Sequence, residues 1–200
     1  MRLFRPWFFQ EWLFPGAVFR IRAGGDNLFL TFDDGPDPEI TPSITAILNK
    51  YKIKALFFCN GEMAEKYPHI IKSMREAGHM VGNHGYAHLD GWKTGDREYI
   101  RNAERASGST SDSIFRPPFG RLTISQFRIL KKCFRIIFWD LMPYDFDPAL
   151  QPEECLKILM KRIRPGSVIV LHDTSGSAAP LILEDFIRGA LARGFEFKLP

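Results

Sequence analysis

Short apolar runs alternate with longer amphipathic stretches along the chain from residue 27 onward. The apolar runs are rich in β-branched and aromatic residues and end at turn-forming residues, so they predict β-strands at 27–32, 54–60, 79–84, 135–140 and 167–172. Shorter apolar runs lie at 114–120 and 195–199. The amphipathic stretches have the apolar periodicity of helices and predict them at 41–52, 67–78, 95–108, 123–133, 152–163 and 179–194.

This regular alternation of strand and helix places the chain in the α/β class. Strands that are apolar on both faces call for a parallel sheet covered by helices. About seven such units favour a closed or nearly closed (β/α) barrel over an open doubly wound sheet. A length of 200 residues with 45% hydrophobic residues is enough for one core, so we expect a single domain.

The first 27 residues stand apart because they are rich in aromatic side chains. They start with basic residues, as a signal peptide does, but Pro6, Gln10, Glu11 and Pro15 interrupt the apolar runs before they reach the length of a signal core or a membrane span. We therefore expect no transmembrane segment and a cytoplasmic location. Residues 1–27 should pack across one end of the domain formed by 28–200, and weak contact with a membrane surface is a second use for them.

Composition narrows the classes of partner. The 27 basic and 23 acidic residues give a net charge of +4 and are interspersed, so nothing calls for a nucleic acid partner, and we expect a monomer. The cysteines, Cys59, Cys133 and Cys155, are widely spaced and form no C-x-x-C pair. This pattern favours buried free thiols over disulfides.

Residues capable of chemistry recur at the carboxyl ends of the predicted strands. In chain order they are Asp33 with Asp34, His84 with His88, Arg116, Trp139 with Asp140, and His172 with Asp173. The carboxyl ends of barrel strands meet at one mouth, so these side chains should converge there. A polar residue often ends a strand for structural reasons alone, but recurrence on five strands favours a site.

Two features of this cluster point to a metal ion. His84 and His88 lie four positions apart, so in a helical turn they could share one cation, although this spacing alone also occurs by chance. Adjacent carboxylates at Asp33 and Asp34 repel each other in a low-dielectric pocket unless a cation binds one of them. Two histidines with one aspartate leave coordination positions for water and substrate, as a catalytic site needs.

Five motifs, in this order, resemble those of the polysaccharide deacetylases of carbohydrate esterase family four, the NodB-type domain: TFDDGP, NHGYAH, RPPFG, WDLMPYDF and VLHDT. The resemblance covers residues 28–197, nearly the whole chain. It implies a distorted (β/α) barrel and a hydrolase that removes N-acetyl or O-acetyl groups from an acetylated sugar or polysaccharide. It also implies a divalent metal cofactor, Zn²⁺ first, with Co²⁺ or another divalent ion as alternatives.

The resemblance also assigns roles to matching residues. It implies a general base, a residue that orients it, a general acid and the carboxylate partner of that acid, which are Asp33, Arg116, His172 and Asp145. The implied metal ligands are Asp34, His84 and His88. The implied oxyanion donor is the backbone N–H of Phe119, and the implied walls of the acetyl-methyl pocket are Trp139 and Leu171. As platforms for sugar rings we add two exposed aromatic candidates, Tyr86 and Trp92.

Three positions depart from the family pattern. Gly85 stands where Ser or Thr is usual between the two histidines, which predicts a looser turn and a weaker metal site. Phe146 replaces a Trp, and Met142 stands where an Asp is common, so that side of the pocket should be less polar.

Two other functions stay open. A different amidohydrolase could use the same machinery on a non-sugar amide. A domain that binds glycans without turnover would have lost a base, an acid or a ligand, whereas all these positions are filled here. A cytoplasmic location would favour an intracellular precursor or a small acetylated sugar over an extracellular polymer.

Overall fold

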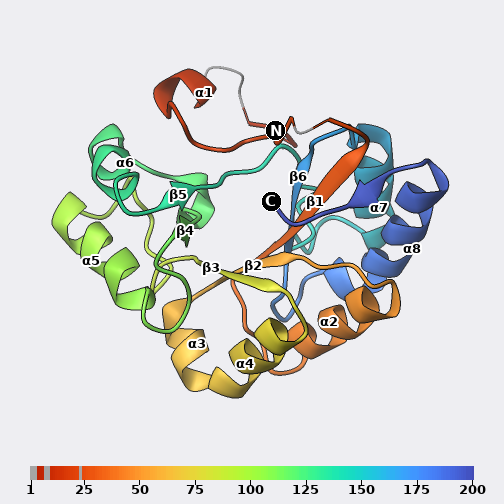
Figure 1. Ribbon diagram of the computed structural model, residues 1–200, viewed down its shortest axis with the longest axis horizontal. Coiled ribbons are helices and arrows are strands. Elements are labelled where there is room, and N and C mark those ends of the chain that lie inside the picture. Colours follow the sequence, from red (N-terminus) through yellow and green to blue (C-terminus); the bar gives the residue numbers. More distant parts are fainter. Residues whose placement is uncertain (1–3, 7–9, 23) are drawn as a thin grey trace.

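The computed structural model describes residues 4–6, 10–22 and 24–200. Among these residues one sheet contains seven strands, and every pairing is parallel: β1 (Asn27–Asp33), β2 (Leu56–Cys59), β3 (Met80–Asn83), β4 (Ile114–Phe115), β5 (Arg135–Ile136), β6 (Val168–His172) and β7 (Glu196–Phe197). The spatial order is β5-β4-β3-β2-β1-β6, and β7 pairs with the start of β1 (Figure 1). The α/β class and the strand number are therefore confirmed.

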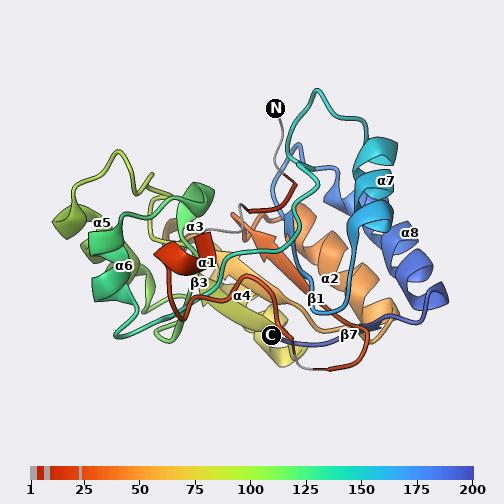
Figure 2. The same cartoon turned by 90° about the horizontal axis from the view of Figure 1, so that it is seen from above.

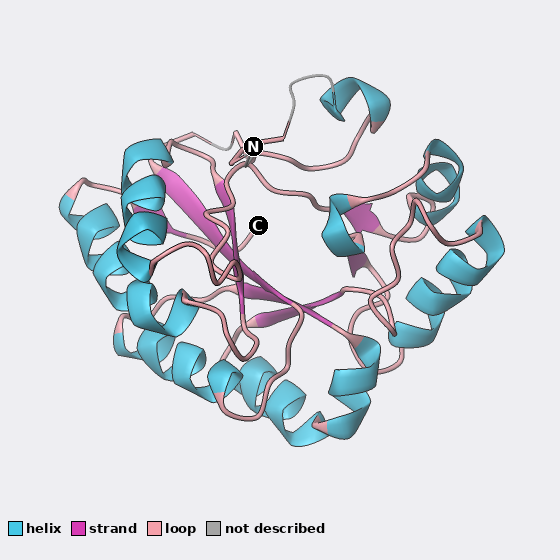
Figure 3. Ribbon diagram, turned by 180° about the vertical axis from the view of Figure 1, so that it is seen from behind, coloured by secondary structure: helices cyan, strands magenta, loops and turns pink. Residues whose placement is uncertain are grey.

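Helices surround the outer side of this sheet (Figure 3). They are α2 (Ile40–Lys50), α3 (Gly61–Lys66), α4 (Pro68–Glu76), α5 (Asp96–Ala106), α6 (Ile124–Leu130), α7 (Pro152–Arg162) and α8 (Ala179–Ala192). The short helix α1 (Gln10–Leu13) lies apart from them in the N-terminal segment, and a 3₁₀ turn, η1, spans Pro118–Gly120. None of the described helices is both long and apolar enough to cross a bilayer.

Irregular chain bridges the gap between the edge strands β5 and β6. Val18 pairs with Ile137, and Leu141 pairs with Ile169 of β6. Figure 2 shows the N-terminal chain crossing from the side of α6 to the start of β1. The ring is thus completed by single bridges instead of a full strand, which makes the barrel distorted, as expected.

Alternation along β1 explains how the sheet buries both faces. Leu28, Leu30 and Phe32 belong to the large core cluster beneath the outer helices, whereas Phe29 belongs to a smaller cluster inside the barrel. Asp33 shares the inner face with Phe29 because the two are four positions apart. The last residue of β1 therefore delivers its carboxylate to the inside of the barrel at the carboxyl end of the strands.

Two expectations are wrong in detail, and one helix was not expected. The strand expected at 135–140 is only two residues long, since the chain beyond Ile136 leaves β4 and contacts Val18 and β6. The separate helix α3 was not expected. Cys133 is exposed, whereas Cys59 and Cys155 are buried free thiols.

Candidate active site

Asp33 and Arg116 form a buried ion pair at the base of the site. Arg116 follows β4, is completely buried, and donates from Nη1 to Asp33 Oδ1 at 2.7 Å. Its other donors are also used: Nη1 reaches the Thr31 hydroxyl at 2.7 Å, and Nε and Nη2 reach two backbone carbonyls. The guanidinium also lies 4.1 Å from the ring centre of Phe58. A guanidinium fixed on all sides holds the Asp33 carboxylate in one orientation.

Asp34 has a left-handed backbone conformation, with φ of 80°. Its N–H donates to the carbonyl of Phe58 at 3.2 Å, and its carbonyl accepts from the side-chain amide of Asn60 at 2.9 Å. The next N–H, of Gly35, donates to Asp173 Oδ1 at 3.1 Å. These contacts stabilise a conformation that costs a non-glycine residue free energy. They turn the side chain of Asp34 away from that of Asp33 although the two residues are adjacent.

His84 and His88 lie in the loop that follows β3, not in the helical turn that their spacing suggested. Positive φ values of 76° at Gly85 and 49° at His88 bend this loop so that the two imidazoles face Asp34. The loop is not loose at Gly85, because its N–H donates to Asn83 Oδ1 at 2.8 Å and its carbonyl accepts from Gly61 N at 2.8 Å. The φ of 76° at Gly85 lies in the left-handed region that favours glycine, and a Cβ there would also lie 2.6 Å from the side-chain nitrogen of Asn102.

The donor atoms of Asp34, His84 and His88 fit a divalent cation. All three lie within 4.8 Å of one another, with Asp34 Oδ1 2.9 Å from His88 Nε2 and 3.3 Å from His84 Nε2. His84 Nδ1 lies 2.9 Å from the carbonyl of Arg116, so Nδ1 carries the proton and Nε2 presents a lone pair. Among the described residues Asp34 Oδ1 has no hydrogen-bond donor. Lone pairs that face one another in this way are stabilised by a cation between them.

His172 and Asp145 form a second buried pair. His172 ends β6, next to Asp33 in the register of the sheet, and its Nδ1 lies 3.0 Å from Asp145 Oδ1. Asp145 also accepts from the backbone N–H of His172 and from the hydroxyl of Ser177, each at 2.8 Å. Burial opposes the charge on the imidazole, but the carboxylates of Asp145, Asp33 and Asp34, with Asp145 first, together outweigh burial and raise the pKa of His172 to about 9. A positive imidazolium is therefore favoured at neutral pH.

These groups open into one cavity of about 530 Å³. Its floor is lined by Asp33, Asp34, His84, His88 and His172. Most of its walls are aromatic: Trp92, Phe119, Phe138, Trp139, Tyr144 and Phe146. Trp92 is 66% exposed and Phe119 is 55% exposed, so the rim offers open ring faces. Trp139 lies against Gly120, where a Cβ would come within 2.3 Å of its ring. The expected site residues Phe119, Trp139 and Trp92 are thus brought to the cavity.

Three expected positions are corrected. Leu171 belongs to the core cluster under the outer helices, because its neighbour His172 takes the inner face. Tyr86 does not line the cavity; its hydroxyl donates to Glu65 at 2.8 Å and its ring lies under the Arg105 guanidinium. The Asp140 carboxylate accepts from the hydroxyl of Ser167 at 2.6 Å, which places it at the amino end of β6 and not at the mouth.

The sequence did not single out several residues that contribute to the site. Arg5, Pro6 and Gln10 of the N-terminal segment and Arg121 after η1 line the cavity. A fourth expected position is also corrected: Asp173, which the sequence placed at the mouth, is completely buried and accepts hydrogen bonds from Gly35 N and the Thr41 hydroxyl. Burial raises the pKa of Asp173 to about 8, although both hydrogen bonds oppose this shift. No periodicity or spacing indicates these contacts, because each joins segments that are remote in the sequence.

Two relatives with assigned names match most of the chain. A peptidoglycan-N-acetylglucosamine deacetylase of Bacillus cereus is 37% identical over 155 residues, which cover 74% of this chain and 56% of that protein. A chitooligosaccharide deacetylase of Azorhizobium caulinodans is 32% identical over 166 residues, which cover 79% of each chain. The chain thus spans little more than half the length of the first relative and most of the second.

Solved structures agree with the fold. The Bc1960 peptidoglycan N-acetylglucosamine deacetylase, in complex with 4-naphthalen-1-yl-N-oxidanyl-benzamide, superposes with a TM-score of 0.85 at 29% identity and covers 96% of this chain. BA3943 of Bacillus anthracis, described as a CE4 family pseudoenzyme, has the same fold with a TM-score of 0.82 at 24% identity, covering 92% of this chain and 66% of its own. The sequence model of the polysaccharide deacetylase family matches residues 21–133, more than half of the chain. This chain therefore belongs to the polysaccharide deacetylases of carbohydrate esterase family four.

Proposed function

We propose that this protein is a metal-dependent deacetylase that hydrolyses the acetamide of an N-acetylated glycan of the peptidoglycan or chitooligosaccharide type and releases acetate. One observation carries the proposal: a carboxylate paired with Arg116, a carboxylate facing two imidazoles, and an imidazole paired with Asp145 all line the same cavity. Membership of the family and the names of the relatives support this activity.

Asp34, His84 and His88 would hold the cation. Bound there, a divalent cation supplies Lewis-acid chemistry, which polarises the acetyl carbonyl and makes a nearby water more acidic. Ligand chemistry favours Zn²⁺, since two imidazoles and one carboxylate are a common zinc set, with Co²⁺ as a substitute.

Asp33 acts as the general base. Arg116 keeps the carboxylate of Asp33 oriented toward the cavity, so that this carboxylate can accept a proton from the attacking water. The water oxygen bonds to the acetyl carbon, and the backbone N–H of Phe119 is the proposed donor to the developing oxyanion.

His172 acts as the general acid. Its Nδ1 is held by Asp145, which leaves Nε2 for the leaving nitrogen of the sugar. When the carbon–nitrogen bond breaks, His172 donates a proton to the departing amine and acetate is released. Trp139 contributes the apolar wall beside the acetyl methyl, and the exposed ring of Trp92 stacks on a neighbouring sugar.

Acetate release tests the proposal. We expect turnover on chitooligosaccharides or peptidoglycan fragments, abolition by a chelator, and recovery with Zn²⁺ or Co²⁺. Full activity after chelation, confirmed by elemental analysis to be metal-free, would contradict the metal mechanism. Glycan binding without acetate release by the metal-loaded protein would instead support a binding domain, and turnover only on non-sugar amides would support a different amidohydrolase.

A further inference from the structure

The positive charge of this chain is concentrated in one stretch. Residues 113–139, which include α6 and β5, contain six cationic residues and no acidic residue. The whole chain has 27 cationic and 23 acidic residues, so outside this stretch acidic residues outnumber cationic ones. Arg116 is buried in the site, but Arg128, Lys131 and Lys132 are exposed along and after α6.

Exposed apolar side chains gather in the same region. On α1, Trp12 is 84% exposed and Leu13 is 47% exposed, and on α6 Ile124 and Ile129 are 38% and 42% exposed. The two helices are neighbours: Phe14, directly after α1, packs on Phe127 of α6 with ring centres 5.1 Å apart. Figures 1 and 2 both show α1 beside α6. We call the surface formed by these apolar residues with Arg128, Lys131 and Lys132 the α1–α6 face.

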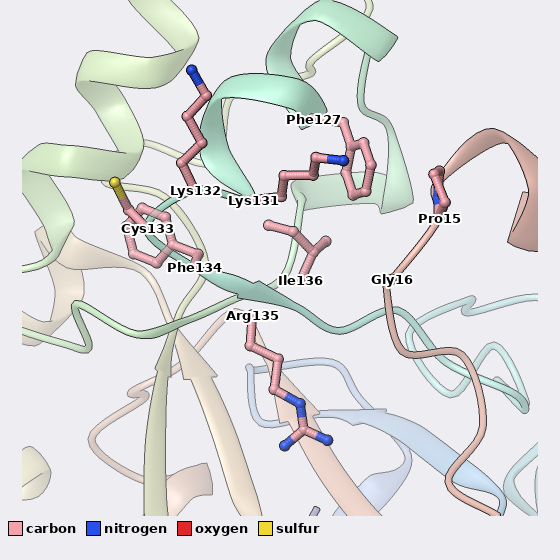
Figure 4. Close-up of a pocket in the computed structure, with 9 residues that line it drawn as sticks. All are labelled: Pro15, Gly16, Phe127, Lys131, Lys132, Cys133, Phe134, Arg135 and Ile136. Atoms are coloured by element: carbon pink, nitrogen blue, oxygen red, sulfur yellow. The ribbon is translucent and has the colours of Figure 1, made fainter.

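A hollow of about 380 Å³ separates the chain after α1 from the end of α6. Figure 4 shows Pro15 and Gly16 on one side of it and Lys131 and Lys132 on the other. The Lys131 side chain runs across the ring of Phe127, with Nζ 5.2 Å from the ring centre, whereas Lys132 points outward. The Lys131 ammonium therefore lies over Phe127, the ring that packs on Phe14 directly after α1, and α1 itself carries one acidic residue, Glu11.

We propose that the α1–α6 face docks on an anionic membrane surface. Trp and Leu partition into the boundary between headgroups and acyl chains, and adjacent Lys and Arg attract anionic headgroups. A soluble polyanion would bind the cationic side chains but would bury neither Trp12 nor Leu13. A face that combines cationic with exposed apolar side chains therefore favours a lipid surface over a soluble polyanion as the partner. Because Gln10 of α1 lines the catalytic cavity, docking would hold that cavity close to the membrane.

Co-sedimentation with sucrose-loaded vesicles tests this inference on the full chain. We expect binding to phosphatidylcholine vesicles containing phosphatidylglycerol, weakening with added salt, and little binding to pure phosphatidylcholine. Lys131→Glu with Lys132→Glu should weaken binding about 25-fold or more, since each cation near the surface contributes about fivefold. Trp12→Ser with Leu13→Ser should weaken it about tenfold or more through lost apolar insertion.

The control variants change exposed residues on other helices. Leu181→Ser on α8 removes a side chain that is 72% exposed, and Lys72→Glu on α4 reverses a charge that is 76% exposed. Both controls should bind vesicles as the unmodified protein does. Equal binding to neutral and anionic vesicles, or equal losses in the control variants, would overturn the inference. Binding to heparin that is as strong as vesicle binding and insensitive to Trp12→Ser would indicate a polyanion site and overturn it as well.

Membrane binding and acetate release can be tested separately. None of the substituted residues lines the catalytic cavity, so acetate release from a soluble chitooligosaccharide should be unchanged in every variant. Thermal unfolding and circular dichroism of each variant establish that it is folded before its vesicle binding is compared.

Discussion

At the end of β1, Asp33 Oδ1 lies 2.7 Å from Nη1 of Arg116, whose guanidinium is completely buried. Asp34, the next residue, faces two imidazoles instead. Two adjacent carboxylates thus have different partners, one a fixed cationic side chain and the other a pair of imidazole nitrogens. This separation leads to a prediction for each residue.

Asp33→Asn and Asp34→Asn should differ in metal content. The amide at position 33 keeps the size of the side chain but cannot accept a proton, so acetate release should fall by roughly 100-fold or more with the metal retained. The amide at position 34 removes a charged ligand, so metal affinity should fall sharply and excess metal should restore part of the rate. Elemental analysis beside the rate distinguishes the roles. Equal loss of metal in both variants would mean that both carboxylates are ligands.

His172 should set the alkaline limit of activity. The carboxylate of Asp145, together with those of Asp33 and Asp34, outweighs the effect of burial and raises the pKa of His172 to about 9. The acid is therefore protonated at neutral pH and loses its proton as pH rises through that value. Asp145→Asn removes the carboxylate, so the alkaline limb of log kcat/KM should move to lower pH. A bound cation lowers the pKa of His172 in both proteins, so the comparison uses the same metal. An unchanged limb in Asp145→Asn would contradict this role.

Trp92 and Tyr86 should behave differently although both were expected to stack on sugars. Trp92 lines the cavity and is 66% exposed, so Trp92→Ala should raise KM for an oligosaccharide by about tenfold and leave kcat nearly unchanged. Tyr86 donates to Glu65 outside the cavity, so Tyr86→Phe should leave both constants unchanged. Steady-state kinetics on the same substrate measure both. A KM change in Tyr86→Phe larger than in Trp92→Ala would reverse the assignment.

His79 should make the fold sensitive to acid. It is 4% exposed, its Nδ1 accepts from Ala55 N–H at 3.2 Å, and burial lowers its pKa to about 4, helped by the nearby Lys54 charge. The pKa in the unfolded chain is about 6.5, so the stability due to neutral His79 is present above that pH and is lost as pH falls toward 4. The loss should be on the order of 1–3 kcal/mol.

Two variants check this dependence by chemical unfolding at pH 7 and pH 4.5. His79→Asn keeps an acceptor but cannot titrate in this range, so it should lose less free energy of unfolding on acidification than the unmodified protein. His69→Asn changes an exposed histidine, so on acidification it should lose as much free energy of unfolding as the unmodified protein does. If all three proteins lost the same free energy of unfolding between pH 7 and pH 4.5, His79 would be ruled out as the source of that loss.

The sequence by itself determined the class of fold and the identity of the chemical groups. Strands that are apolar on both faces can only be buried under helices, and this local pattern does not depend on distant contacts. The residues at the strand ends follow from the same pattern, because a parallel barrel brings all carboxyl ends to one mouth. The sequence alone therefore predicts that five of these residues converge: Asp33, Asp34, His84, Arg116 and His172.

Only the tertiary structure decided which face each side chain takes and which remote segments meet. Leu171 and His172 are adjacent, yet strand alternation gives the outer core to one and the cavity to the other. The sequence predicts Asp140 at the mouth, but the chain beyond β5 crosses to β6 and places this carboxylate at the amino end of β6. A register that shifts by one residue, or a strand that changes its neighbour, moves a side chain to the opposite face or end of the barrel. Such choices depend on packing and hydrogen bonds between segments that are far apart in sequence, which a local pattern does not contain.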